Sequence, residues 1–200
     1  MFVSLEGIDG AGKSTQAKLL AGALGPDTLL LREPGGTPVG ERLRGLLKDP
    51  ATELSARTEL LLFTAARAEL VESVIRPALA AGRAVVCDRF MDSTVAYQGS
   101  ARGLGVELVA ELNRIAVGDC RPDRTVLLRL PPGEADSRGA GRGEFGSDRF
   151  EREGSAFRAA VAQAFEDLAA AEPQRFVVVE ASGGVDQVHR QVLEALAVGG

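Results

Sequence analysis

Eight consecutive residues near the start of the chain have the types and spacing of a phosphate-binding loop. Residues 7–14 read Gly-Ile-Asp-Gly-Ala-Gly-Lys-Ser, which fits the pattern G-x-x-x-x-G-K-S. In such a loop, backbone N–H groups converge on phosphate oxygens, the lysine reaches the outer phosphates and the serine hydroxyl suits Mg²⁺. We therefore expect nucleoside triphosphate binding by Gly7, Ile8, Asp9, Gly10, Ala11, Gly12, Lys13, Ser14 and Thr15.

A phosphate loop works only between a strand and a helix, and the chain supplies this alternation along its whole length. Short apolar runs predict strands at 2–5, 28–31, 84–87, 125–130 and 176–179. Helical patterns lie at 13–24, 38–48, 53–80, 103–117, 155–171 and 185–197. The apolar runs are too continuous to leave a wet face, so we predict a five-stranded parallel sheet with helices on both faces. This is an α/β fold of the phosphate-loop NTPase type, formed by one domain over residues 1–200.

The third predicted strand ends in an acid and a base. Asp88 and Arg89 follow the apolar run at 84–87, and ligands of open α/β sheets bind at the carboxyl ends of strands. We expect Asp88 and Ser14 to serve a Mg²⁺ ion, and Arg89 to hold phosphate through paired N–H donors. The alternative is a local surface ion pair, which would contribute at most about 1 kcal/mol.

Two further groups could bind a base. Phe63 and Arg67 are four residues apart in a helical stretch and share a face, so a ring and a guanidinium could stack on a base and bond its edge. Thr94, Tyr97 and Gln98 repeat this arrangement if the segment after Arg89 is helical. Spacing alone favours a structural role for Phe63 and Arg67, because a Phe in an apolar helix is more often core and an Arg four residues on is more often solvated. For Thr94, Tyr97 and Gln98, spacing leaves a structural and a functional role equally open.

Residues 137–149 differ from the rest of the chain, because four glycines alternate with charged residues and little can pack in a core. We predict a mobile flap here that carries Arg138, Arg142 and Arg149.

Composition limits the partners and the compartment. The net charge of −5 and the pI near 5.1 argue against nucleic-acid binding and favour small phosphorylated ligands. Cys87 and Cys120 lack metal-ligand spacing and are expected to be reduced thiols. The start of the chain has no leader pattern, and no run of about 18 apolar residues occurs, so we expect a cytoplasmic protein without a membrane partner.

Four blocks of sequence together resemble bacterial thymidylate kinases. They are residues 6–16, 32–37 (Arg-Glu-Pro-Gly-Gly-Thr), 62–67 and 88–99 (beginning Asp-Arg-Phe), followed by Arg-Pro-Asp at 121–123. The resemblance spans nearly the whole chain. It implies transfer of the γ-phosphoryl group of ATP to thymidine monophosphate with Mg²⁺, usually in a homodimer. The long apolar region at 53–80 could supply the helical face for such a dimer.

The resemblance also assigns roles in the base and sugar sites. Phe63 would stack on thymine, and Arg67 would donate to its carbonyl edge. Thr94 and Gln98 would contact the base, while Tyr97 would lie beside the sugar, where it would crowd a ribose 2′-hydroxyl.

The remaining assignments concern phosphates and metal. Arg44 and Arg89 match positions that hold the acceptor phosphate, and Asp9 and Glu33 match acids near the sugar hydroxyl and the phosphate-bound metal. The family carries a catalytic basic residue either in the phosphate loop or in the flap. This loop has Gly10 after the aspartate, so the charge must come from Arg138, Arg142 or Arg149. Arg142 aligns best, and the expected catalytic residues are Lys13, Arg89, Arg142 and Arg149.

Two rival functions are weighed against this one. A kinase for uridylate or adenylate could share the fold, but the Phe63, Arg67 and Tyr97 pocket suits a pyrimidine deoxynucleotide. A GTP-dependent switch would need a guanine-reading Asn-Lys-x-Asp motif, which the sequence lacks.

Overall fold

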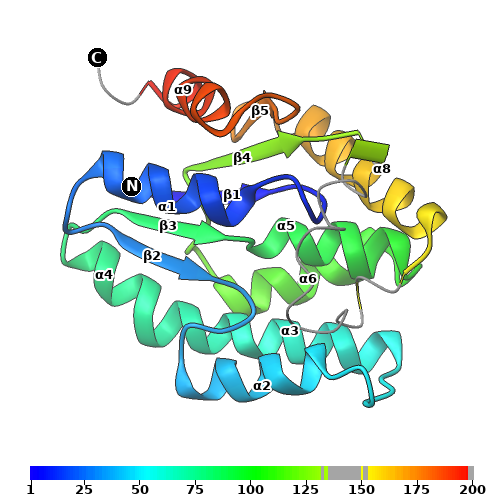
Figure 1. Cartoon of the computed structure of the whole chain (residues 1–200). Coiled ribbons are helices and arrows are strands. Elements are labelled where there is room, and N and C mark those ends of the chain that lie inside the picture. The colour runs from blue at the N-terminus through cyan, green and yellow to red at the C-terminus, as the bar shows by residue number, and fades with distance from the viewer. Residues whose placement is uncertain (132, 135–149, 151–152, 198–200) are drawn as a thin grey trace.

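A computed structural model describes residues 1–131, 133–134, 150 and 153–197. Its centre is a five-stranded sheet with the order β2-β3-β1-β4-β5, in which every neighbouring pair is parallel (Figure 1). The predicted α/β sheet architecture is therefore confirmed. The strands are β1 (Phe2–Glu6), β2 (Leu29–Arg32), β3 (Val85–Asp88), β4 (Arg124–Arg129) and β5 (Phe176–Glu180).

Helices connect successive strands and cover both faces of the sheet, as parallel pairing requires. Most of the region predicted to be helical at 53–80 forms one continuous helical stretch from Ala56, with a π-helical segment between two α-helices. The elements are α1 (Lys13–Leu24), α2 (Pro38–Lys48), α3 (Ala56–Leu70), η1 (Val71–Ile75), α4 (Arg76–Ala80), α5 (Met91–Thr94), η2 (Val95–Ala101), α6 (Val106–Val117), α8 (Ser155–Ala171) and α9 (Val185–Ala195).

Alternate residues of the central strands belong to two separate hydrophobic cores, one on each face of the sheet. Val3 and Leu5 pack with residues of α1, α8 and α9 on one face of the sheet. Phe2 and Cys87 pack on the other face with residues of α3, η1, α4 and α6. These strand residues are at most 1% exposed, so burial of both faces fixes the register of β1 and β3.

The edge strands differ from the prediction that no strand has a wet face. In β2, Leu30 is 44% exposed, and in β5, Val178 is 39% exposed. An edge strand has a neighbour on one side only, so helices that span to the next strand leave part of it uncovered. The apolar runs at 28–31 and 176–179 are strands, but only the three inner strands are largely buried.

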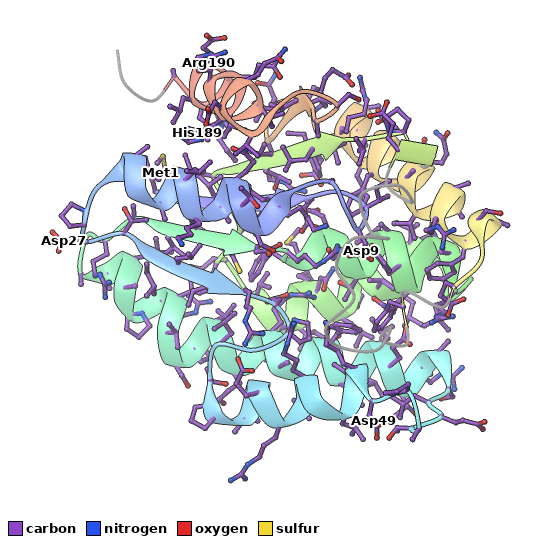
Figure 2. All side chains as sticks on the ribbon, in the orientation of Figure 1. Met1, Asp9, Asp27, Asp49, His189 and Arg190 are labelled. Atoms are coloured by element: carbon purple, nitrogen blue, oxygen red, sulfur yellow. The ribbon has the colours of Figure 1, made fainter. Side chains whose placement is uncertain are left out.

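The carboxyl ends of the strands point to the side of the molecule on which Asp9 lies, and Asp27, just before β2, lies at the opposite end (Figure 2). The phosphate loop, the Asp88-Arg89 pair and the Arg-Glu-Pro segment after β2 therefore meet at one edge. No helix among the described residues is long and apolar enough to cross a membrane.

Candidate active site

The phosphate loop joins β1 to α1 through positions that need glycine. Gly7 has a φ of 136°, and a Cβ there would lie 2.5 Å from the carbonyl oxygen of Leu128 on β4. Gly12 has a φ of 91° and precedes the first residue of α1. The loop can therefore pass close to the sheet and bring N–H groups to the start of a helix.

Lys13 is folded back over this loop. Its Nζ donates to the carbonyl oxygen of Ile8 at 2.8 Å and lies 3.9 Å from Oδ1 of Asp9. Burial and the nearby Arg89 lower the pKa of Lys13 to about 8, while Asp9 opposes the change. An incoming polyphosphate would supply the negative charge that restores the fully charged amine.

Ser14 and Asp88 form the pair expected at a metal site. Oγ of Ser14 donates to Oδ2 of Asp88 at 2.5 Å, whereas Oδ1 of Asp88 is buried and has no hydrogen-bond partner among the described residues. An orphaned carboxylate oxygen beside a loop hydroxyl fits a divalent cation, and Mg²⁺ takes few protein ligands because phosphates and water complete its shell.

Arg89 is held in an unusual backbone conformation at the centre of the site. Its φ is 71°, in the left-handed region that non-glycine residues rarely adopt. Its guanidinium contacts Oδ1 of Asp9 at 2.5 Å, the hydroxyl of Tyr97 at 3.2 Å and the hydroxyl of Ser93 at 3.1 Å. Although burial opposes it, the charges of Arg89 and Lys13 hold the pKa of Asp9 below its usual range.

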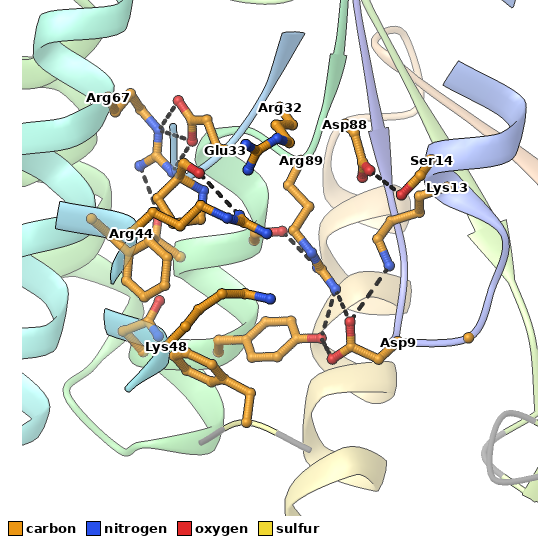
Figure 3. Close-up of a pocket in the computed structure, with 18 of the residues that line it drawn as sticks. Asp9, Lys13, Ser14, Arg32, Glu33, Arg44, Lys48, Arg67, Asp88 and Arg89 are labelled. Carbon is orange, nitrogen blue, oxygen red and sulfur yellow. Dashed lines mark hydrogen bonds and ion pairs between the residues drawn. The ribbon is translucent and has the colours of Figure 1, made fainter. Parts of the chain in front are cut away.

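One pocket extends from the phosphate loop to the face of α3 (Figure 3). Cationic side chains outnumber carboxylates in its lining, so the space favours a phosphorylated anion. The residues expected to bind the acceptor nucleotide all line it: Asp9, Glu33, Arg44, Phe63, Arg67, Arg89, Thr94, Tyr97 and Gln98.

Arg67 is the most deeply enclosed charge in this pocket. Its side chain is 1% exposed and forms a 2.6 Å ion pair with Glu33. The other N–H groups donate to Thr94, Asn113 and the carbonyl of Phe90, so protein acceptors account for all five donors. A base carbonyl would have to share a donor already in use. Burial raises the pKa of Glu33, and the charge of Arg67 opposes that rise.

The segment after Arg89 is helical, as the spacing of Thr94, Tyr97 and Gln98 requires. Thr94 closes α5, and the other two residues lie on η2, a π-helical stretch of the kind often found at functional sites. The ring of Tyr97 packs against aromatic rings of α8 and against Phe150, while Phe63 faces Phe150 at 5.8 Å between ring centroids.

Arg44 reaches the pocket from α2. Thr37 caps this helix by accepting a hydrogen bond from the N–H of Gly40 at 2.9 Å, which fixes where α2 begins. Arg44 donates to the carbonyl of Pro34 at 3.0 Å, and its side chain and that of Lys48 point into the space in front of Arg89 in Figure 3.

The pocket also contains residues that the sequence motifs did not assign. Lys48 follows Arg44 by four residues on α2, so helical spacing could have identified it, whereas Arg89 precedes the helix that holds Ser93 and helical spacing does not relate the two. Arg32 directly precedes Glu33 at the end of β2, whereas no local signal marks Phe150. The unassigned residues are Arg32, Pro34, Lys48, Ser93 and Phe150.

Some expected residues do not reach the pocket or cannot be placed. In the loop, Ile8 and Ala11 belong to the hydrophobic core. Gly7 and Thr15 are not part of the pocket lining, although Asp9, Gly10, Gly12, Lys13 and Ser14 are. The flap at 137–149, with Arg138, Arg142 and Arg149, lies outside the described residues.

Comparison with known proteins decides the family. A family model described as thymidylate kinase matches residues 5–192. The chain belongs to the thymidylate kinase family. The thymidylate kinase of Pseudomonas putida (strain W619) is 50% identical over 196 residues, which are 96% of this chain and 94% of that protein. The thymidylate kinase of Symbiobacterium thermophilum is 46% identical over 196 residues, with 96% and 90% coverage.

Solved structures agree with the sequence comparison. The crystal structure of thymidylate kinase from Ehrlichia chaffeensis aligns with a TM-score of 0.80 at 35% identity, and the match covers 98% of each chain. The resemblance identified from the sequence motifs is thus confirmed, and the fold is the phosphate-loop type found in this thymidylate kinase. The chain is a kinase of this family.

Proposed function

We propose that this chain transfers the γ-phosphoryl group of ATP to the 5′-phosphate of thymidine monophosphate, giving thymidine diphosphate and ADP. The observation that carries the proposal is one continuous pocket that joins the phosphate loop to a slot between α3 and η2. The loop suits a triphosphate donor, and the slot offers an aromatic ring and polar groups to a base. Family membership favours the same reaction.

On the donor side, Lys13 and the loop N–H groups would hold the outer phosphates of ATP. Ser14 and Asp88, and Asp9 nearby, would hold Mg²⁺. The bound ion would neutralise charge on the transferring phosphoryl group. An acceptor that is already a phosphate anion needs no strong base, so the chain's task is to bring two polyanions into line.

On the acceptor side, Arg44 and Arg89 would bind the phosphate of thymidine monophosphate, since both reach the pocket between α2 and the loop. Phe63 would stack on the base, while Arg67, Thr94 and Gln98 would face its edge. Tyr97 would lie beside the sugar. Asp9 is hydrogen-bonded to Tyr97 at 3.1 Å and would lie close to the sugar as well. Glu33, bound to Arg67, would act mainly by fixing that guanidinium.

The flap would complete the site. Arg142 is the residue that we assign to the transferring phosphoryl group, with Arg149 as its neighbour in catalysis and Arg138 as the alternative. Closure of the flap would exclude water that could otherwise accept the phosphoryl group.

A homodimer is the assembly that we expect, and only part of the region at 53–80 is exposed enough to contribute to its surface. The apolar residues of 53–80 are mostly in the core, where Leu60, Leu70 and Ile75 are fully buried. Exposed apolar side chains near this region include Leu61 on α3 and Val106, Leu108 and Ile115 on α6, a helix that packs against α3. Sedimentation at several concentrations would test whether this face joins two copies.

Cys87 and Cys120 are both buried free thiols. Because unpaired cysteines fit a reducing compartment, we expect the enzyme to act in the cytoplasm. Fractionation of cells that produce the tagged full chain would test this expectation.

The test of the activity is an ADP-release assay with ATP, Mg²⁺ and a panel of monophosphates of thymidine, deoxyuridine, uridine, cytidine and adenosine. We expect thymidine monophosphate to be preferred and thymidine diphosphate to appear. If another acceptor wins, the base-site roles of Phe63, Arg67 and Tyr97 fail while the donor site stands. If none reacts, the proposal as a whole fails.

A further inference from the structure

A buried carboxylate lies behind the slot proposed for the base. Glu59 is on α3, four residues before Phe63 and eight before Arg67, so the three side chains share one face of the helix. Nε2 of Gln98, on η2, donates to Oε1 of Glu59 at 2.8 Å. Glu59 and Gln98 are each 1% exposed, and Gln98 lines the pocket.

Glu59 is itself held in place by Arg102, the residue that directly follows η2. Nε of Arg102 lies 3.3 Å from one oxygen of Glu59, and a terminal nitrogen of Arg102 lies 3.4 Å from the other. Arg102 is in turn 2.5 Å from Glu153 and lies over the ring of Phe157, with 4.7 Å from guanidinium carbon to ring centroid. These contacts favour an ionised carboxylate in a fixed position.

The contact fixes which end of the Gln98 amide faces the pocket. An ionised carboxylate only accepts hydrogen bonds, so the NH₂ group must turn toward Glu59 and the carbonyl oxygen away from it. A reversed amide would bring two oxygens together at hydrogen-bond distance in a buried place, with no proton between them. Among the residues that the structure describes, no donor reaches Oε1 of Gln98.

We propose that Glu59 is a specificity-determining positioning residue, which holds the Gln98 amide so that it presents an acceptor to the base. Across the slot, Arg67 can only donate. A donor beside an acceptor matches the 4-carbonyl and the N3–H of a thymine-type or uracil-type ring. Cytosine has the opposite polarity, with an amino group and an unprotonated N3. The inference rests on the proposed acceptor site and adds the reason why that site would reject cytosine nucleotides.

The test compares kcat/KM for thymidine and deoxycytidine monophosphates in the full-length enzyme and in Glu59→Gln. A glutamine at position 59 can offer either an oxygen or an NH₂ group, so Gln98 can turn over. We expect the thymidine-to-deoxycytidine ratio to fall about tenfold, and KM for thymidine monophosphate to rise while its kcat at saturation changes little. Glu59→Asp keeps an acceptor-only group and should keep the ratio closer to that of the parent, even if its KM rises.

Glu194→Gln is the matched control, because it makes the same change at an exposed acid on α9, outside the pocket lining, and should leave the ratio unchanged. A folded Glu59→Gln enzyme with the parental ratio and KM would overturn the inference. If Glu59→Gln does not fold, a Glu59→Asp enzyme that loses base discrimination would overturn it too. A parent enzyme that prefers deoxycytidine monophosphate would overturn both the proposed function and the inference. If the parent enzyme prefers thymidine monophosphate, the proposed function stands, and the Glu59 variants then test the inference alone.

Discussion

Glu6 lies beneath Arg89 and secures the backbone that follows it. One oxygen of the Glu6 carboxyl group accepts from the N–H of Phe90 at 2.7 Å, and the other accepts from the hydroxyl of Ser93 at 2.6 Å. That hydroxyl accepts a hydrogen bond from Arg89 at 3.1 Å. A buried acid at the end of β1 thus supports the left-handed conformation of the arginine assigned to the acceptor phosphate.

This arrangement predicts a pH-dependent stability. Burial and the charge of Asp92 raise the pKa of Glu6 to about 8. Because the folded chain binds this proton more tightly than the unfolded chain, the stabilisation is complete below the ordinary pKa of 4.5 and is lost as pH rises toward 8. The contribution to the slope is at most about 1.4 kcal/mol per pH unit. Glu6→Gln removes the titrating charge; its amide oxygen can still accept from the N–H of Phe90, while its NH₂ group must donate to the Ser93 hydroxyl instead of accepting from it. Urea unfolding across this pH range should therefore show a flatter dependence.

The control for this prediction is Glu111→Gln. The pKa of Glu111 is lowered by its hydrogen bond to Arg114, so this residue titrates below the pH range in question and should leave the slope unchanged. Parallel stability curves for the parent and Glu6→Gln would contradict the prediction.

Asp88→Asn is predicted to weaken the use of Mg²⁺. The substitution neutralises the carboxylate whose buried oxygen lacks a partner beside Ser14. We expect the Mg²⁺ concentration for half-maximal activity at fixed ATP to rise by at least about tenfold. Asp119→Asn removes an acid that is 87% exposed and should leave the Mg²⁺ titration unchanged. Equal midpoints for Asp88→Asn and the parent would remove Asp88 from the metal site.

The parts of this fold that the sequence predicts best are those whose causes are local. The glycines at 7–14 allow the backbone conformation of a phosphate loop, so this loop can be recognised from its own residues. Each strand lies within one residue of its predicted bounds at each end. The exposure of β2 and β5 could not be predicted, because it depends on which strands become the edges of the sheet. Strand order is set by contacts between distant segments, which no local pattern records.

In the site, too, residues with a local sequence signal could be predicted, whereas residues that act through distant contacts could not. Arg89 directly follows a strand, and ligands of parallel sheets bind at the carboxyl ends of strands, so its place in the site could be predicted. Glu59, in contrast, has the sequence context of an ordinary acid in the first turn of a helix, after the capping residue Ser55. Its contact with Gln98 joins residues 39 positions apart. Glu6 likewise meets Ser93 only because β1 and β3 pair. Isolated acids of this kind have no spacing signal, so their roles appear only when the chain is folded.

Glu33→Gln is predicted to be strongly destabilising. The side chains of Glu33 and Arg67 are 4% and 1% exposed and form a two-point ion pair. Replacing one partner leaves an uncompensated buried charge, which costs about 3–5 kcal/mol. Urea unfolding near neutral pH would measure this loss, and KM for thymidine monophosphate should rise because Arg67 is no longer fixed. A loss no larger than that of Glu111→Gln would contradict the prediction.

Arg142→Ala is predicted to lower kcat far more than it weakens nucleotide binding. A flap arginine that meets the transferring phosphoryl group stabilises charge that develops in the transition state and adds little to ground-state affinity. Steady-state kinetics with both substrates varied, together with direct binding of ATP, would separate the two effects. An unchanged kcat would move the role to Arg138 or Arg149, which single alanine variants of each would then identify.

Arg89→Lys is predicted to be nearly as damaging as removal of the side chain. The guanidinium of Arg89 contacts Asp9, Tyr97 and Ser93 at once through two nitrogens. A lysine has a single nitrogen and cannot span these partners while it also binds a phosphate in a two-point manner. We expect kcat/KM for thymidine monophosphate to fall by at least about a hundredfold, while KM for ATP changes little. Arg83→Lys, at an exposed arginine that bonds the carbonyl of Asp27, serves as the control. If Arg89→Lys retained activity close to that of this control, a point charge would suffice at position 89, and the two-point contact with the acceptor phosphate would have to be abandoned.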